Sequence, residues 1–424
     1  MANKSSPRIR LVHFADAHID LARQGRRDAE TGLPLRVVDF MKSLDVIVDA
    51  ALKEEADLVI FSGDAYRDRS PAPTYQREWG ERMMRLSTAG IETILVLGNH
   101  DVTPAAGRAH TMQEFETLQV PHIHVASRPE LLGPDNLNGL QVQIITVPWV
   151  NRSGLAAALD DGQDISEELG EQLTGVVDNL MDDLDPSLPA ILAGHLSVQG
   201  AVYGNERSVM LGRDVVLPAS LVKDERLDYV ALGHIHKAQN LNEGGHHPVI
   251  YPGSIERVDF GEVRDRKTFV LAEVGRNSTN FEQRDLPGRK FIDVDVELED
   301  PGDAQEKILQ SLPEPDELKD AIVRMVVMYP RDLEALIDEP RIRSAAEAAF
   351  EFHFIRRPKI RPRLRLPGGK SAVNMPPLEV LDLYWKAVTP DFADTDMLND
   401  LAGQIIRSVE SVELPENSGE DIEA

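Results

Sequence analysis

The sequence predicts an α/β fold, in which short apolar strands alternate with longer amphipathic helices. Between residue 8 and about residue 285, apolar runs of strand length recur, and the stretches between them show helical spacing. Five of these runs are followed at once by a block that carries Asp, Asn or His. Because the ends of parallel strands meet at one edge of a sheet, these blocks predict a shared ligand site at that carboxyl edge.

The strands and helices of this region can be placed one by one. We expect strands at 12–14, 58–61, 94–97, 191–193 and 229–232, and helices at 39–54, 74–88 and 166–184. In the first of these helices Phe40, Leu44 and Val48 recur at intervals of four residues, which is typical of one buried helix face.

The composition is that of a soluble globular protein. The chain of 424 residues is long enough for two or three domains, with 42% hydrophobic and 28% charged residues. It contains no cysteine, which excludes disulfides and thiolate metal sites. The first residues form no apolar signal core, and no apolar run of about 18 residues occurs. We therefore expect a cytoplasmic protein with no membrane partner.

The net charge of −27 disfavours a broad nucleic-acid surface, because DNA-binding proteins are usually basic where they contact phosphate. Local charge nevertheless decides contact, since the Debye length is about 8 Å at physiological salt. Two divalent cations would outweigh two ligand aspartates and leave the pocket cationic. The overall acidity therefore does not exclude a phosphate substrate.

Seven side chains in the five blocks are candidate metal ligands. They comprise two carboxylates, one amide and four imidazoles: Asp16, His18, Asp64, Asn99, His195, His234 and His236. The pairs in the first and last blocks are two residues apart, which points both side chains to one side of an extended chain. The two oxygens of Asp64 allow it to bridge two cations. This ligand set predicts two divalent ions. We expect Mn²⁺, with Fe or Zn as alternatives, because Mg and Ca prefer all-oxygen ligands.

His100 follows Asn99 directly, so we expect it to face the substrate as an acid or phosphate donor instead of sharing the metal. We expect Asp101 to hold the His100 ring in the useful orientation. The remaining histidines follow no such pattern and are expected to be structural or solvated: His13, His110, His122, His124, His246, His247 and His353.

The chain changes character after residue 285. Residues 292–298 alternate apolar and acidic side chains as a half-buried strand does, and a helix at 305–312 and a strand at 322–328 complete a small α+β module. Residues 356–370 (RRPKIRPRLRLPGGK) are basic and proline-rich and predict a linker. Two short amphipathic helices follow. We place the domains at 1–285, 286–366 and 367–424.

The five blocks resemble the calcineurin-like metallophosphoesterase superfamily over roughly residues 8 to 260. More narrowly, the chain resembles the DNA double-strand-break repair nucleases, which in bacteria include SbcD-like subunits of SbcCD exonucleases. The motifs that carry this closer resemblance are GD at 63–64, RSPAP at 69–73, GHIHK at 233–237, YPGSIER at 251–257 and DFGE at 259–262. It implies a two-sheet sandwich flanked by helices, a small capping domain, and carboxyl-terminal helices that bind an ATPase.

The resemblance also implies how the ligands are shared. The first metal would be held by Asp16, His18, Asp64 and His236, and the second by Asp64, Asn99, His195 and His234. His100 would be the catalytic histidine. Some relatives carry a histidine three residues after the bridging aspartate, where this chain has Arg67. Arginine can bind a phosphate but cannot shuttle a proton, so the balance of exonuclease and endonuclease action is left open.

The implied activity is two-metal hydrolysis of DNA phosphodiesters at ends or hairpins during double-strand-break repair. Two alternatives stay open: a small-molecule phosphodiesterase or phosphatase of the same superfamily, and a non-catalytic scaffold that recruits an ATPase. The net acidity favours the first alternative, and the long segment after the metal blocks disfavours it. The complete ligand set argues against the second.

The same resemblance implies DNA, a second copy of this chain and an SbcC-like coiled-coil ATPase as partners, with a homodimer inside a heterotetramer. Candidate DNA-binding side chains are basic residues near the blocks: Arg23, Arg26, Arg27, Arg67, Arg69 and Arg207. The candidate dimer patch lies on two expected helices, 74–88 and 109–118: Met83, Met84, Leu86, Met112, Phe115 and Leu118. Apolar stripes on the two last helices are the candidate ATPase-binding surface.

Overall fold

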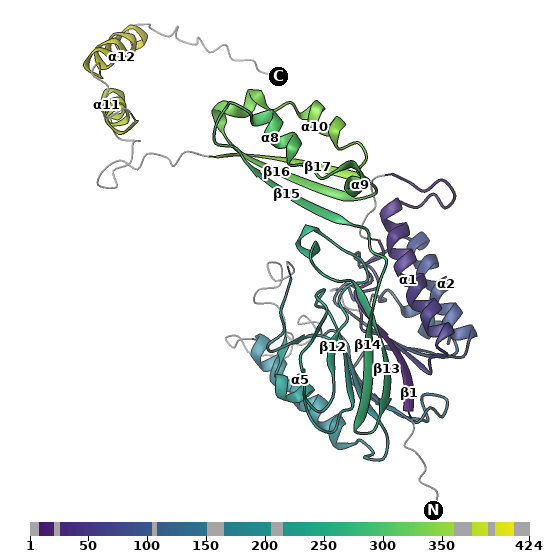
Figure 1. Ribbon diagram of the computed structural model, residues 1–424. Helices are drawn as coiled ribbons and strands as arrows, with labels where there is room; N and C mark the ends of the chain where they lie inside the picture. Colours follow the sequence, from purple (N-terminus) through teal and green to yellow (C-terminus); the bar gives the residue numbers. More distant parts are fainter. Residues whose placement is uncertain are drawn as a thin grey trace, which may run out of the picture. The chain divides into compact units, whose positions relative to one another are not determined.

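Two six-stranded sheets pack face to face, with helices on their outer faces (Figure 1). The computed structural model describes residues 8–20, 26–103, 108–150, 165–204, 215–359, 375–388 and 395–410. The arrangement confirms the predicted two-sheet α/β sandwich. It follows from strands that are apolar on both faces and therefore need cover on both sides.

The first sheet has the strand order β14-β13-β1-β2-β3-β4. Its strands are β1 (Arg8–Phe14), β2 (Leu58–Phe61), β3 (Glu92–Val96), β4 (Ile123–Ala126), β13 (Thr268–Gly275) and β14 (Ser278–Asp285). Strands β1 to β4 are parallel, and the β13–β14 hairpin runs antiparallel to β1. The ends of β1, β2 and β3 therefore lie along one edge.

The second sheet has the order β11-β12-β10-β7-β6-β5. Its strands are β5 (Glu130–Leu132), β6 (Gln143–Val147), β7 (Ala190–His195), β10 (Tyr229–Gly233), β11 (Gln239–Asn240) and β12 (Val249–Tyr251). Strands β6, β7, β10 and β12 are parallel. A separate two-stranded pair is formed by β8 (Ser197–Val198) and β9 (Val216–Leu217).

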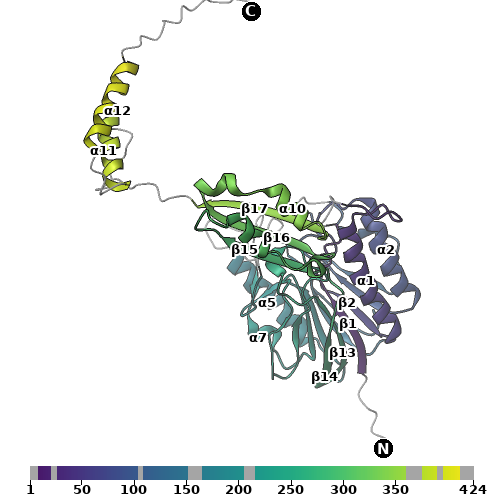
Figure 2. The same ribbon diagram turned by 45° about the horizontal axis from the view of Figure 1, so that its top comes forward.

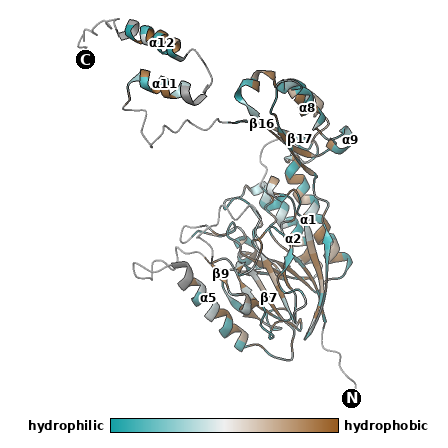
Figure 3. Cartoon of the chain, turned by 60° about the vertical axis from the view of Figure 1, so that its left-hand side comes forward, coloured by the Kyte–Doolittle hydropathy of each residue, from teal (hydrophilic) through white to brown (hydrophobic). Residues whose placement is uncertain are grey.

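The period-2 alternation of strands divides the core into layers. On β2, Leu58 and Ile60 belong to the core between the two sheets. The alternate residues Val59 and Phe61 belong to the core beneath the outer helices. Figure 3 shows hydrophobic residues gathered on the strands, while the helices carry both kinds of residue. The sheets are thus held by burial on both faces.

Helices α1 (Leu35–Lys53) and α2 (Pro73–Thr88) cover the first sheet and lie side by side (Figures 1 and 2). Helices α5 (Ile165–Asp182) and α7 (Ala219–Val222) cover the second. α1 begins four residues before the predicted start, directly after Pro34 in the N-cap position. α3 (Gln113–Thr117) is shorter than the helix predicted at 109–118.

The module after residue 285 is a three-stranded sheet of order β15-β16-β17 with short helices. Its elements are β15 (Phe291–Glu297), α8 (Ala304–Gln310), α9 (Pro315–Leu318), β16 (Ile322–Pro330), the 3-10 helix η3 (Arg331–Leu336), α10 (Glu339–Ala345) and β17 (Glu351–Lys359). The predicted linker was wrong for residues 356–359, which belong to β17. An edge strand tolerates a proline such as Pro358, because its outer side needs no ladder hydrogen bond.

The last described elements are α11 (Pro377–Val388) and α12 (Thr395–Glu410), which pair through Asn399 and Asp382. The chain divides into two compact units, of which the first comprises 1–295, 308–326 and 339–355 and the second comprises 296–307, 327–338 and 356–424. The predicted domain boundaries stay a prediction. Within the described residues, no helix is both long and apolar enough to cross a lipid bilayer.

Candidate metal centre

The carboxyl ends of β1, β2, β3, β7 and β10 bring the five polar blocks together. The amide of Asp16 donates to the carbonyl of Gly63 over 2.9 Å, and the amide of His18 donates to the carbonyl of Asp64 over 3.1 Å. The amide of His234 donates to both carboxylate oxygens of Asp16, over 3.2 and 3.1 Å. These bonds tie blocks that lie far apart in the sequence into one site.

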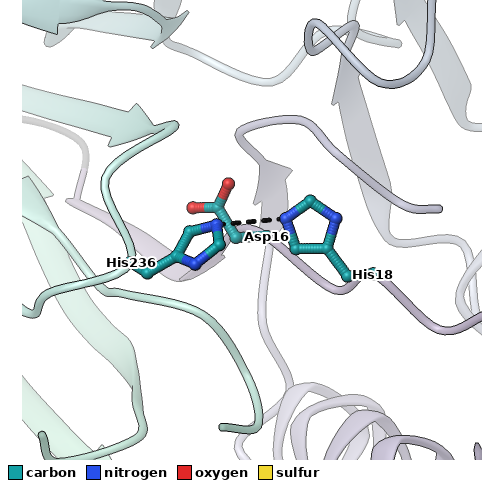
Figure 4. Close-up of side chains that lie close together, drawn as sticks. All are labelled: Asp16, His18 and His236. Atoms are coloured by element: carbon teal, nitrogen blue, oxygen red, sulfur yellow. Dashed lines mark hydrogen bonds between the residues drawn. The ribbon is translucent and has the colours of Figure 1, made fainter. Parts of the chain in front are cut away.

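One group of donor atoms is formed by Asp16, His18 and His236 (Figure 4). The Nε2 atoms of the two imidazoles lie 3.1 Å apart, and one ligand atom from each residue lies within 4.8 Å of the others. All three residues are buried. A buried carboxylate between two inward-facing imidazoles is the donor set of a divalent transition metal.

A second group gathers around Asn99. Its Oδ1 atom lies 3.0 Å from Nε2 of His195 and 3.1 Å from Nδ1 of His234. A carbonyl oxygen and two ring nitrogens thus converge on one point, and Asn99 is only half-buried, so this side of the centre faces outward.

Asp64 lies between the two groups. Its Oδ2 atom is 3.7 Å from Nε2 of His18 and 3.6 Å from Nε2 of His195. A carboxylate oxygen equally distant from ligands of both groups has the position that a bridging ligand needs.

Four of the candidate ligands adopt backbone conformations that side chains rarely take. The φ angle is +52° at Asp16, +40° at His18, +64° at Asp64 and +95° at His234. Each such residue costs about 1–3 kcal/mol and persists only where its surroundings require it. This concentration of strain at one sheet edge indicates a functional site.

Two glycines make room for candidate ligands, Gly98 for Asp64 and Gly63 for His195. A Cβ on Gly98 would lie 2.1 Å from Oδ1 of Asp64, and a Cβ on Gly63 would lie 2.3 Å from Nδ1 of His195. Gly63 also has a φ of +94°. The glycine in each of these blocks is therefore part of the site.

Burial sets the charge state of the site. Burial raises the pKa of Asp16 to about 7, although the imidazole of His236 opposes the rise. Burial acts in the same direction on Asp64, but His195, His100 and His18 together outweigh it and lower the pKa of Asp64. Burial lowers the pKa of His195 to about 4. Neutral imidazoles beside buried carboxylates fit a bound cation, which would stabilise the ionised form of Asp16.

The structure places His100 at the site but corrects the role of Asp101. His100 is half-buried, its amide donates to Oδ1 of Asp64 over 2.8 Å, and its Nδ1 lies 2.8 Å from the carbonyl of Arg67. The expectation that Asp101 holds this ring was wrong. The Asp101 carboxylate instead accepts the amides of Asp64, Ala65 and Gly98 and the Thr111 hydroxyl. It braces the backbone around Asp64.

Three contacts to the imidazoles of the candidate ligands were not assigned from the sequence. The carbonyl of Ser62 lies 2.6 Å from Nδ1 of His195, and Glu262 lies 2.8 Å from Nδ1 of His236. The ring of Trp149 lies 5.0 Å from that of His234. Trp149 follows strand β6 just as the five blocks follow their strands. This position is the feature of the sequence that could have placed Trp149 at the site.

The candidate DNA-binding arginines differ in their surroundings. Arg67 and Arg69 are exposed beside the centre, and Nε of Arg69 donates to the carbonyl of Asn99 over 3.1 Å. Arg26 lies over the ring of Phe350, and Arg27 donates to the carbonyl of Gly32. Two candidates lie outside the described residues: Arg23 and Arg207.

The histidines expected to be structural have partners away from the centre. His13 is buried between Tyr229 and Ser62. His122 and His124 both contact the carboxylate of Glu92, at 2.6 and 2.7 Å. The others contact their own neighbours: His110 with Glu116, His247 with Val222, His246 with His247, and His353 with Glu351.

Comparison with known proteins matches residues 9–238 to the family model described as calcineurin-like phosphoesterase. The chain belongs to the calcineurin-like phosphoesterases. Members of this family bind divalent metals, and residues 9–238 contain every candidate ligand of the centre. The protein is therefore a metal-dependent phosphoesterase by family, and the buried His and Asp donors fit such ions.

One curated relative is the DNA double-strand break repair protein Mre11 of Archaeoglobus fulgidus. It is 25% identical over 316 residues, which cover 72% of this chain and 65% of the relative. The chain thus spans slightly less than two thirds of that relative's length.

Solved structures similar to the chain include a dimetal phosphatase from Danio rerio, with 12% identity and a TM-score of 0.37, and the protein TT1561 of Thermus thermophilus, with 14% identity and a TM-score of 0.38. Each match covers 65% of this chain, and 98% and 99% of the respective structures.

Proposed function

We propose that this phosphoesterase is a DNA nuclease that hydrolyses phosphodiester bonds at DNA ends or hairpins during double-strand-break repair. The observation that carries the proposal is the reach of the similarity to Mre11. That similarity extends over 316 residues, which is more than the stretch 9–238 can contain, so it includes residues beyond the range that matches the family model.

The proposed ligands divide as the two groups of donor atoms do. Asp16, His18 and His236 would hold one ion, Asn99, His195 and His234 the other, and Asp64 would bridge them. The ions we propose are Mn²⁺, with Fe or Zn as alternatives, and when bound they would supply an activated water and charge neutralisation.

His100 is the proposed catalytic residue that touches the substrate. Its Nδ1 lies 2.8 Å from the Arg67 carbonyl, which can only accept a hydrogen bond, so Nδ1 carries a hydrogen. Nε2 is then the ring nitrogen that faces the substrate. The ring centroid is 5.2 Å from that of His18, at the half-buried side of the centre. From there His100 stabilises charge on the phosphate or protonates the leaving oxygen.

The proposed ATPase partner, a coiled-coil protein similar to SbcC, binds α11 and α12. Three apolar side chains on α12 are exposed: Met397 at 73%, Leu401 at 53% and Ile405 at 56%. Short helices with exposed apolar faces are marginal alone and gain stability in a groove. The doubly substituted Leu401→Asp/Ile405→Asp should lose co-purification with the co-expressed ATPase, while Asp396→Ala/Asp400→Ala on the same helix retains it. Retention by both variants would contradict this assignment.

The proposed homodimer rests on a smaller patch than the sequence suggests. Four of the six candidate residues are buried in the core of their own chain: Met83, Leu86, Met112 and Phe115. Met84 and Leu118 are exposed, at 43% and 73%. Light scattering of wild type and Met84→Glu/Leu118→Glu tests the interface. A dimer that the double variant converts to a monomer supports it, and a monomeric wild type at micromolar concentration contradicts it.

A nuclease assay tests the function itself. Wild type and Asp64→Asn are compared on blunt duplex, hairpin and single-stranded DNA, with Mn²⁺ or Mg²⁺, and on bis(p-nitrophenyl) phosphate. We expect Mn²⁺-dependent cleavage of DNA by wild type and none by the variant. Hydrolysis of the small diester alone would support a small-molecule phosphodiesterase, and no hydrolysis of any substrate would support a scaffold.

A further inference from the structure

A buried carboxylate holds His236 from behind. Nδ1 of His236 lies 2.8 Å from Oε1 of Glu262, which is 2% exposed. The other ring nitrogen of His236 lies 3.1 Å from Nε2 of His18, inside the candidate metal centre. An imidazole that donates its Nδ1 hydrogen to a carboxylate keeps the Nε2 lone pair free for a cation.

The second oxygen of Glu262 is held by a buried lysine. Oε2 accepts the Lys267 ammonium over 2.7 Å and the amide of Val258 over 2.9 Å. Lys267 is 3% exposed and also donates to the hydroxyl of Ser254 over 2.7 Å. A buried ion pair of this kind often stabilises a fold no better than apolar packing, so its position behind a ligand suggests a role in the site.

The turn that carries Glu262 is fixed as well. Glu262 ends the 3-10 helix η2 (Phe260–Glu262), and the ring of Phe260 lies 5.1 Å from that of Phe291 and 5.7 Å from that of His353. The guanidinium of Arg324 lies 4.6 Å above the Phe260 ring. Side chains from the module after residue 285 thus seat the turn and leave Glu262 little freedom to move.

We propose that Glu262 is a positioning residue that fixes the tautomer and orientation of His236, and that Lys267 holds Glu262 in that position. The pair thereby sets the affinity of the centre for its cation. This inference rests on the proposed role of His236 as a metal ligand. It adds to that role two residues outside the predicted ligand set.

Calorimetric titration of the full-length, metal-free protein with Mn²⁺ tests the proposal without DNA. Glu262→Gln keeps the shape but offers an amide to Lys267, so we expect Mn²⁺ affinity to fall about 10–100-fold at one of the two sites. Glu256→Gln is the matched control. Glu256 is also fully buried, in the same segment, and accepts the amides of Arg257 and Arg289 instead of a candidate ligand. Its Mn²⁺ affinity should stay within twofold of wild type.

Equal Mn²⁺ affinity of Glu262→Gln and wild type, or equal losses in both variants, would overturn the proposal. Asp64→Asn in the same titration distinguishes failure of the Glu262 proposal from failure of the proposed metal centre. If Asp64→Asn loses Mn²⁺ binding and Glu262→Gln keeps the wild-type affinity, only the role of Glu262 is refuted. If Glu262→Gln does not fold, ¹⁵N spectra of histidine-labelled wild type decide. We expect hydrogen on Nδ1 of His236, assigned with His236→Gln, and hydrogen on Nε2 alone would overturn the proposal.

Discussion

The carboxylate of Asp101 holds the backbone of Asp64, whose amide it accepts over 2.7 Å. The same carboxylate accepts the amides of Ala65 and Gly98 over 3.1 and 2.9 Å. These bonds explain how Asp64 keeps its left-handed φ of +64° between the two groups of candidate ligands. Asp101 thus acts on the centre through the chain and not through His100.

Asp101→Asn should therefore destabilise the protein. Its amide would face backbone N–H groups that then lack an acceptor in a buried site, at a cost of about 2–4 kcal/mol in the free energy of unfolding. Urea denaturation of the metal-free protein measures this cost. Asp185→Asn, at an aspartate whose carboxylate accepts from Ser187 on an exposed turn, is the control and should change stability by less than about 1 kcal/mol. If Asp101→Asn lowers the free energy of unfolding no more than Asp185→Asn does, Asp101 does not brace the backbone around Asp64.

His100→Ala should separate turnover from metal binding. Because His100 lies beside the ligands and is not one of them in our assignment, we expect kcat to fall about 10²–10⁴-fold. Mn²⁺ affinity should stay within about twofold by calorimetry. His124→Ala, which removes an imidazole bonded to Glu92, controls for the loss of a ring elsewhere. Loss of Mn²⁺ together with activity would make His100 a ligand.

Stability should fall as the solution becomes acidic, in part through His13. Burial lowers the pKa of His13 from 6.5 to about 3, so between these values the unfolded chain binds a proton that the folded chain does not. The free energy of unfolding contributed by this group is fully present above pH 6.5. It falls by up to about 1.4 kcal/mol per pH unit below that value.

His13→Gln cannot titrate and keeps a polar side chain at the position that contacts Tyr229 and Ser62. Urea denaturation of the metal-free proteins between pH 7 and pH 5 should give a shallower decline for this variant than for wild type. Parallel declines would show that His13 does not contribute.

DNA binding should depend on Arg67 and Arg69, which are exposed beside the centre. If each contacts one phosphate of a duplex, Arg67→Ala/Arg69→Ala should reduce the slope of log affinity against log salt by about 1.8. Arg8→Ala/Arg128→Ala removes two arginines that pair with Glu273 and Glu130, and it should leave the slope unchanged. Fluorescence anisotropy at several salt concentrations measures the slopes. The same slope in wild type and in the Arg67/Arg69 variant would remove these arginines from the interface.

Much of the fold was predictable because it rests on local pattern. Strands that end in Asp, Asn or His, such as the strand before His195, are visible as apolar runs, and parallel strand ends meet at one edge. The start of α1 at Leu35 was missed because the usual start signals are absent there: no side chain caps the helix, and its first turn carries no acidic residue. Tertiary pairing, which the sequence does not display, turned residues 356–359 from linker to strand.

The site was predictable in its residue types but not in its supporting contacts. Spacing indicated which side chains share an edge, and the structure brings all seven candidate ligands there. The partner of a ring nitrogen depends on side-chain rotation and on chain segments far away in the sequence. For that reason the Arg67 carbonyl behind His100 and Glu262 behind His236 could not be assigned from spacing. The apolar spacing that placed Met83 in the candidate dimer patch is likewise compatible with a buried core position, which is where the structure places Met83.

The central claim is that Asp64 joins two metal ions in one centre. Anomalous diffraction from crystals of the full-length protein soaked in Mn²⁺ tests it most directly, because it locates each ion without reference to activity. The account predicts two peaks, one beside Asp16, His18 and His236 and one beside Asn99, His195 and His234, with the Asp64 carboxylate between them. A single peak, or two peaks of which one does not contact Asp64, would contradict it.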